Sequence, residues 1–181
     1  SVTVLPNPYA TEYGRFASGL VVIESSRAHD AWRFRLNRFG PSLRSRNDGG
    51  LRFDGYSPRL EVGGPLVRNR LFLQQTMQMR IAVGDTASRP ETEQRVTKAV
   101  STFSRLDANL TPRHLVVASV GLFPNYTDQA TVGTFVPPDA SANVHLFGTL
   151  ASLTERSVWT DRVIGETTFQ WFRSQIGRAH V

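Results

Sequence analysis

Residues 70–81 read RLFLQQTMQMRI, and this stretch decides the fold because its side chains alternate with a period of two. One face of the extended chain carries the apolar residues Leu71, Leu73, Met77, Met79 and Ile81. The other face carries the polar residues Arg70, Gln74, Thr76, Gln78 and Arg80. Successive side chains of a strand point to opposite faces, whereas these glutamines would fall on every face of a helix. The stretch therefore predicts a β-strand with one apolar side and one wet side.

Residues 31–39, AWRFRLNRF, repeat the alternation with bulkier side chains. The apolar set is Trp32, Phe34 and Leu36, and the polar set is Arg33, Arg35 and Asn37. A strand with apolar side chains on one face and arginines on the other can belong to a soluble sheet. It can also belong to a barrel in lipid. Weaker patterns predict further strands at about residues 51–62, 96–110, 115–123, 144–154 and 162–173.

Connections between the predicted strands alternate in length. Long polar loops are predicted where turn-forming residues gather, at Gly40–Gly50, Gly84–Arg95 and Pro124–Asn143. Short connections are predicted at Gly63–Pro65, Thr111–Arg113 and near Val158–Asp161. Outer-membrane barrels have short periplasmic turns and longer extracellular loops, so the long connections are expected outside the cell. A soluble sandwich has no reason to keep all its long loops at one end.

The composition favours β-structure with many turns. The 181 residues are 40% apolar, with 14 Gly, 10 Pro and 2 Met. No apolar run approaches the ~20 residues that a membrane-spanning helix needs, which excludes a helical membrane protein. Membrane-spanning β-strands are still possible, because half of the residues in such a strand are polar and no long apolar run is needed. The absence of cysteine removes disulfide frameworks, thiol nucleophiles and thiolate metal sites.

The chain carries a net charge of +6, and Lys98 is its only lysine among 21 basic residues. A basic balance suggests nucleic-acid binding when the charges cluster in a patch or along one helix. Here the arginines are spread singly along alternating strands. The charge pattern therefore predicts no nucleic-acid partner.

No catalytic constellation is present in the sequence. The histidines His29, His114, His145 and His180 are not paired at metal-ligand spacing. The sequence also lacks a nucleophile elbow, a dinucleotide fingerprint and a phosphate-binding loop. We therefore predict a protein that is not an enzyme, with no catalytic residue, no metal site and no cofactor.

Residues 12–22, EYGRFASGLVV, resemble the end of the plug domain of TonB-dependent outer-membrane receptors. The motif positions are Glu12, Tyr13, Gly14, Arg15 and Gly19. Residues 63–72 and 103–112 are similar to later segments of the same family, in the same order. The chain departs from the family at Ser18, where a second glycine is usual, and at Val22–Ser26, where an Asn-x-Val-Thr-Lys-like ending is usual.

The resemblance implies an all-β fold: an antiparallel meander that forms part of a large transmembrane barrel, preceded by the end of a plug. Residues 1–29 would be the C-terminal part of the plug and residues 30–175 the first strands of the barrel. Residues 176–181 resemble a translated sequencing adapter and are set aside. The implied function is energy-coupled uptake of a scarce ligand, such as a ferric chelate, cobalamin or an oligosaccharide. The implied partners are outer-membrane lipid, this unidentified small ligand, and TonB acting through a segment that precedes this sequence.

The candidate site residues are three arginines. By the resemblance, Arg15 pairs with barrel carboxylates and holds the plug, although an exposed turn arginine explains it equally well. Arg33 and Arg35 are expected to contact the plug or water inside the barrel, and the alternative is that they clamp an anionic substrate. The alternative function for the whole chain is a soluble all-β carbohydrate-binding or interaction module.

If residues 30–175 are only the first strands of a large barrel, as the resemblance implies, the shape of their sheet can be predicted. A barrel large enough to hold a plug needs many more than seven strands, so this sheet is expected to be open. The strands at Ala31–Phe39 and Arg162–Arg173 should each lack a partner on one side. Residues 1–29 are expected to pack against the arginine-bearing, concave face.

Overall fold

The computed structural model describes residues 2–5, 20–23, 30–45, 50–84, 86, 88, 90 and 93–180. Within these residues the chain is all-β, apart from one short 3₁₀ turn at Pro138–Ala140. The strands are β1 (Val2–Leu5), β2 (Leu20–Ile23), β3 (Arg33–Asn37), β4 (Ser42–Ser45), β5 (Leu51–Tyr56), β6 (Arg59–Val67), β7 (Leu71–Val83), β8 (Val96–Thr111), β9 (His114–Asp128), β10 (Ala142–Thr160) and β11 (Val163–His180). The predicted all-β class is confirmed.

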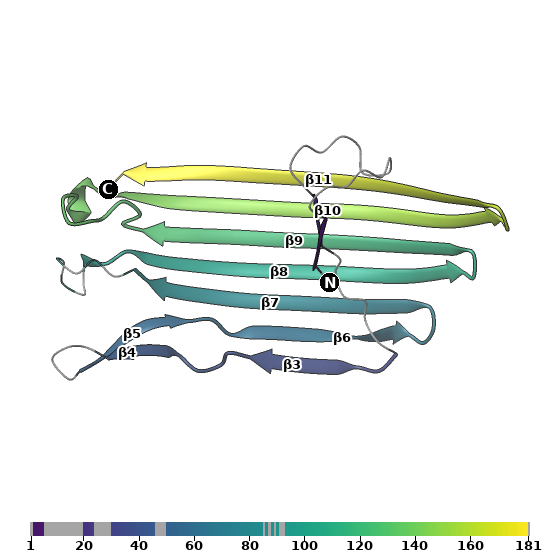
Figure 1. Ribbon diagram of the computed structural model, residues 1–181, viewed down its shortest axis with the longest axis horizontal. Helices are drawn as coiled ribbons and strands as arrows, with labels where there is room; N and C mark the ends of the chain where they lie inside the picture. Colours follow the sequence, from purple (N-terminus) through teal and green to yellow (C-terminus); the bar gives the residue numbers. More distant parts are fainter. Residues whose placement is uncertain are drawn as a thin grey trace.

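Nine of these strands form one antiparallel sheet, which Figure 1 shows face-on. Strands β11, β10, β9, β8 and β7 lie side by side in reverse chain order. Beyond β7 the sheet divides, because β6 pairs with residues 71–78 of β7 while β5 pairs with Ile81 and Ala82. Strand β3 then pairs with β6, and β4 with β5. The nine strands thus lie in seven rows, which matches the seven strands predicted from the alternation.

Local backbone chemistry explains why two rows are broken. Pro58 separates β5 from β6, and proline has no N–H to donate to a ladder. Its carbonyl still accepts a hydrogen bond from the Met79 N–H at 3.1 Å, so β7 stays attached across the break. Between β3 and β4, Arg38 has a φ of 53° and is followed by Gly40 and Pro41. A left-handed residue next to glycine and proline ends the extended chain.

Two predicted connections are wrong in position. The predicted loop Gly40–Gly50 contains β4, so the first row continues to Ser45. The predicted connection Gly63–Pro65 lies inside β6, and the turn falls at residues 68–70, where Asn69 has a φ of 60°. Glycine and proline are typical of a turn, but the pairing of β6 with β7 keeps this segment extended.

The alternation of long and short connections is confirmed. Residues 68–70, 112–113 and 161–162 make tight turns at one end of the sheet, which we call the short-turn end. The connections that follow β4, β7 and β9 lie at the opposite, long-loop end (Figure 1). The predicted loop Pro124–Asn143 is shortened to residues 129–141, because β9 and β10 extend into it. Residues 176–180, set aside in the sequence analysis, pair with residues 142–146 of β10.

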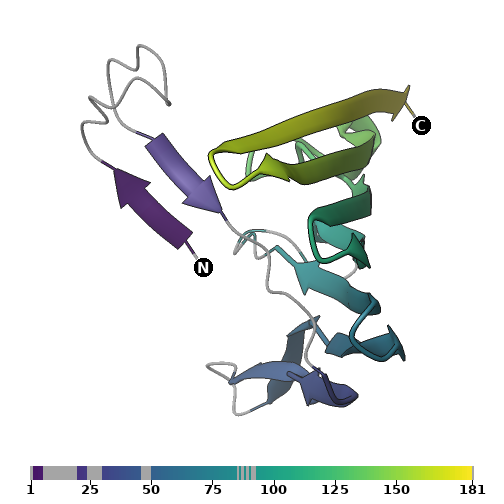
Figure 2. The same cartoon turned by 90° about the vertical axis from the view of Figure 1, so that its right-hand side faces the viewer.

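The sheet is one layer thick and bends along its width (Figure 2). Its outer rows pair on one side only within the described residues, so the predicted open sheet is confirmed. Among the described large apolar side chains, Phe72 alone is buried, at 5% exposure. The accessible surface is 13018 Å² for 20.2 kDa, against roughly 8,800 Å² for a compact monomer of this mass. The described sheet therefore lacks the hydrophobic core of a globular domain.

Strands β1 and β2 pair only with each other, in antiparallel register. Figure 2 shows this pair standing beside the large sheet rather than joining it. The side chains of residues 1–29 lie outside the described residues. Their packing against the arginine-bearing face is therefore still a prediction.

Candidate functional site

The strand register divides the side chains of the large sheet into two faces. Directly opposed residues share a face, and Leu73 lies opposite Leu106, which lies opposite Ala118. The face that contains them is called the apolar face; it carries Leu60, Val62, Leu71, Leu73, Met77, Met79, Ile81, Val100, Leu106, Ala108, Val116, Ala118, Val120, Leu122, Phe147, Ala151, Leu153, Phe169 and Trp171. The opposite, polar face carries the polar residues predicted for 70–81. The two predicted faces of this stretch are confirmed.

The apolar residues form a band of limited height. On β8 the band runs from Val100 to Ala108, a distance of eight residues. At about 3.4 Å per residue this height is roughly 27 Å. Polar pairs lie at both edges: Lys98 and Asp128 are 3.0 Å apart at the long-loop end, and His114 and Glu155 are 3.3 Å apart at the short-turn end. The ring of Tyr126 also lies at the long-loop edge, 4.1 Å from the ring of His145.

A polar cluster interrupts the band on β7 and β8. Gln75 Nε2 donates to Thr102 Oγ1 at 2.7 Å, and the Ser104 hydroxyl donates to Gln75 Oε1. Each side chain therefore finds its partner inside the cluster, which lowers the cost of its apolar surroundings. On the outermost strand, Arg173 and Gln175 also lie on the apolar face, opposite Thr149 and Phe147.

Arginine and glutamate make a cluster on the polar face near the first row of the sheet. Glu61 on β6 accepts from Arg35 on β3 at 3.3 Å, and it lies 2.7 Å from Arg59 on its own strand. Arg33 lies opposite Gly63, two residues away along β3. Arg33 and Arg35 thus share the polar face, as predicted, while Arg15 and the motif positions Glu12, Tyr13, Gly14 and Gly19 lie outside the described residues.

A second ion pair on the polar face is more deeply buried. Arg105 donates to both carboxylate oxygens of Asp107, at 3.0 and 2.8 Å. Asp107 is 1% exposed and lies opposite Phe72 in the register. The sequence predicted a strand at about residues 96–110, and neither residue was singled out within it. The available signal was an arginine and an aspartate two residues apart in one strand, which puts both on the same face.

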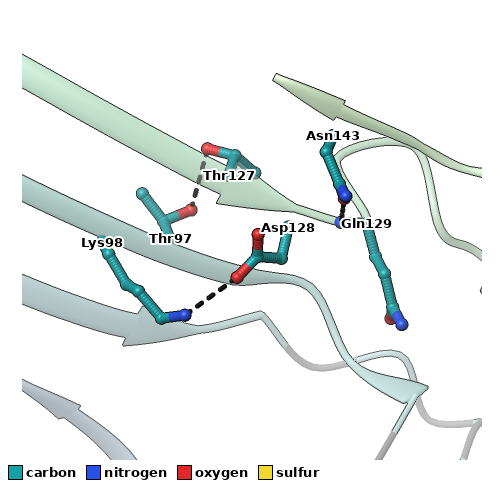
Figure 3. A network of polar contacts seen from close by, with 6 residues as sticks. All are labelled: Thr97, Lys98, Thr127, Asp128, Gln129 and Asn143. Atoms are coloured by element: carbon teal, nitrogen blue, oxygen red, sulfur yellow. Dashed lines mark hydrogen bonds and ion pairs between the residues drawn. The ribbon is translucent and has the colours of Figure 1, made fainter. Parts of the chain in front are cut away.

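Short hydrogen bonds fix the long-loop end (Figure 3). Asn143 at the start of β10 accepts from the backbone N–H of Gln129 at 2.9 Å, where the chain turns with a φ of 52°. Ser141 accepts in turn from the Thr131 N–H at 3.0 Å. In the preceding connection, buried Gln94 bonds both backbone groups of Thr86. These hydrogen bonds join the two ends of each connection to one another across its described residues.

The short-turn end contains a basic depression of about 740 Å³. It is lined by the four arginines Arg68, Arg70, Arg113 and Arg156, by the apolar residues Leu110, Pro112, Leu115 and Val158, and by Asn69, Asn109, Thr111 and His114. No aspartate or glutamate belongs to the lining. The arginines are spread singly along the sequence, and the fold brings four of them together.

The described part of the chain was also searched for a metal site and for a membrane-spanning helix. It contains no cluster of three or more potential metal-ligating His, Cys, Asp or Glu residues, and no helix long and apolar enough to cross a membrane. No protein family, curated protein or solved structure shows a significant match to this chain.

Proposed function

We propose that this chain is the end of the plug and the first barrel strands of a TonB-dependent outer-membrane receptor. The observation that carries the proposal is the apolar band, roughly 27 Å high, on one face of an open single-layer sheet. Transmembrane barrels present an apolar band about 25 Å tall to lipid and a polar interior. The resemblance of residues 12–22 to a plug supplies the family.

The lengths of the connections support this proposal and give the orientation of the strands in the outer membrane. A strand that leaves a plug on the periplasmic side climbs outward, so its first connection should be long. In this chain the connections after β4, β7 and β9 are the longer ones, and the turns at 112–113 and 161–162 are tight. The long-loop end is accordingly the extracellular end, and the short-turn end is periplasmic.

In this proposal the protein catalyses no reaction. A scarce ligand binds from outside, TonB acts on the plug, and the ligand passes into the periplasm. Arg33 and Arg35 contact the plug or the water that fills the barrel, with Glu61 holding Arg35 in place. The candidate ligands are a ferric chelate, cobalamin and an oligosaccharide.

Single cysteines test the placement, because the 181 residues contain no cysteine. Asp139→Cys at the long-loop end should react with a membrane-impermeant maleimide on intact cells, whereas Pro112→Cys should react only after the outer membrane is opened. The reverse labelling would overturn the topology. Uptake of a ferric chelate, cobalamin and an oligosaccharide should then be compared in cells with and without the gene, and with and without TonB. If all three uptake rates are independent of both genes, the transport proposal fails for these ligands.

A further inference from the structure

We propose that the basic depression at the short-turn end is a binding site for a small organic phosphate. The depression combines three turns that are distant in sequence, at residues 68–70, 112–113 and the end of β10. Its volume, about 740 Å³, lies within the range that small-molecule sites occupy, roughly 300–1,000 Å³. The site does not depend on the proposed transport function, because the local arrangement of charge alone supports it.

The depression carries positive charge that no neighbouring carboxylate in the described part of the chain compensates. Arg68, Arg70, Arg113 and Arg156 line the depression, and among the described residues none has a carboxylate within 4 Å. Elsewhere in the sheet, Arg35, Arg59 and Arg105 do have such partners. Four arginines gathered without a counterion repel one another, and a bound anion removes that repulsion.

Two carboxylates that lie near the depression in the strand register form no ion pair with its four arginines. Glu155 precedes Arg156 but points to the apolar face, where it contacts His114 and Ser157. Glu166 lies directly opposite Arg156 in the register of β10 and β11, and the two side chains form no ion pair. The lining therefore keeps a charge of +4 from its arginines alone.

The chemical class of the ligand follows from the lining. The planar guanidinium group donates two parallel hydrogen bonds to phosphate or carboxylate oxygens. Several arginines around one depression suit the higher charge of a phosphate monoester better than a single carboxylate. Leu110, Leu115 and Val158 add apolar surface for an organic group.

The register favours a soluble ligand over a lipid headgroup. Arg70, Asn109, Leu115 and Arg156 occupy neighbouring strands on the polar face, because Asn109 donates its backbone N–H to Arg70 and lies opposite Leu115, which lies opposite Arg156. Their side chains thus lie on the face opposite the apolar band. A soluble phosphate reaches that face from water.

Titration of the intact protein in detergent with phenyl phosphate tests the site. We expect saturable binding that weakens as salt is raised, with much weaker binding of benzoate and none of phenol. Arg70→Gln and Arg156→Gln should each weaken binding roughly tenfold or more, since each removes charge-assisted hydrogen bonds to the phosphate. Arg80→Gln is the matched control, because Arg80 lies on β7, the strand that begins directly after Arg70, and on the same face, but outside the depression.

Each outcome decides the proposal. Circular dichroism and thermal midpoints should show that the three variants fold like the parent, and Arg113→Gln, in a turn, provides a further variant. Absence of phenyl phosphate binding by the folded parent would overturn the site. An equal loss in Arg80→Gln would reduce it to general attraction by a basic surface. Binding to nanodiscs with phosphatidylglycerol, but not to phenyl phosphate, would replace the soluble ligand by a lipid headgroup.

Discussion

On the apolar face of the sheet Met77 is 47% exposed, whereas on the polar face Asp107 is 1% exposed. A water-soluble protein arranges such residues the other way round, with methionine inside and aspartate outside. Some charges of the polar face have internal partners: Arg105 pairs with Asp107, and Arg35 pairs with Glu61. The apolar face has only a few polar contacts and a broad exposed surface. The difference indicates that the apolar face is built to be covered by an apolar medium or partner.

Breaking the buried ion pair should have the largest effect on this comparison. Asp107→Ala leaves Arg105, whose side chain is 17% exposed, without its two carboxylate acceptors. Breaking a buried pair by removing one partner costs about 3–5 kcal/mol. We expect a loss of that size in the free energy of unfolding, measured by denaturant titration in detergent. Asp161→Ala, in an exposed turn, is the control and should change stability little. Equal losses would mean that the pair on the polar face is not buried.

The second largest effect is expected when an arginine is introduced on one face or the other of β7. Met77→Arg places a cation in the middle of the apolar band, where insertion into lipid should cost about 2–4 kcal/mol. Gln78→Arg, one residue further, lies on the polar face and loses only a hydrogen bond to Ser57, worth about 1 kcal/mol. The folding yields in lipid vesicles should therefore differ strongly. Equal yields would contradict the assignment of the faces or the lipid environment.

Two adjacent glycines test the packing of the faces at a smaller scale. A Cβ on Gly64, on the apolar face, would lie 2.5 Å from the Trp32 ring and 2.8 Å from its Cα. A Cβ on Gly63, on the polar face, would lie 3.2 Å from the flexible end of Gln74 and 3.5 Å from the Leu73 carbonyl oxygen, which is ordinary contact. Gly64→Ala should therefore cost about 1–3 kcal/mol by overpacking, and Gly63→Ala clearly less. The thermal midpoints of the two variants measure the difference. A larger loss for Gly63→Ala would place Trp32 elsewhere.

The ion pair at the long-loop edge of the band should have the smallest effect. Lys98 and Asp128 are 59% and 41% exposed at a separation of 3.0 Å. Exposed pairs of this kind contribute about 0.2–1 kcal/mol and are screened by salt. Lys98→Gln should lower stability by no more than this amount, and the loss should vanish at high salt. A loss that persists at high salt would show that the pair is shielded from water.

The candidate site was only partly visible from the sequence. Alternation placed Arg33, Arg35 and the residues of 70–81 on their faces, because side-chain direction in a strand is a local property. The burial of Asp107 was not visible, since it depends on Phe72 in the neighbouring strand. The basic depression was missed for the same reason: Arg70, Arg113 and Arg156 meet only when the turns of three hairpins are brought to one end.

The sequence by itself determined the strand class, the two faces and the alternation of loop lengths, because each follows from the order of neighbouring residues. Only the tertiary structure decided the cross-strand register, the division of the first rows into β3 with β4 and β5 with β6, and the pairing of both β5 and β6 with β7. Proline and glycine carry the same local signal at a turn, as at Gly40–Pro41, and inside a strand, as at Gly64–Pro65. The partner strand distinguishes these cases, since its hydrogen bonds either continue past the residue or end there.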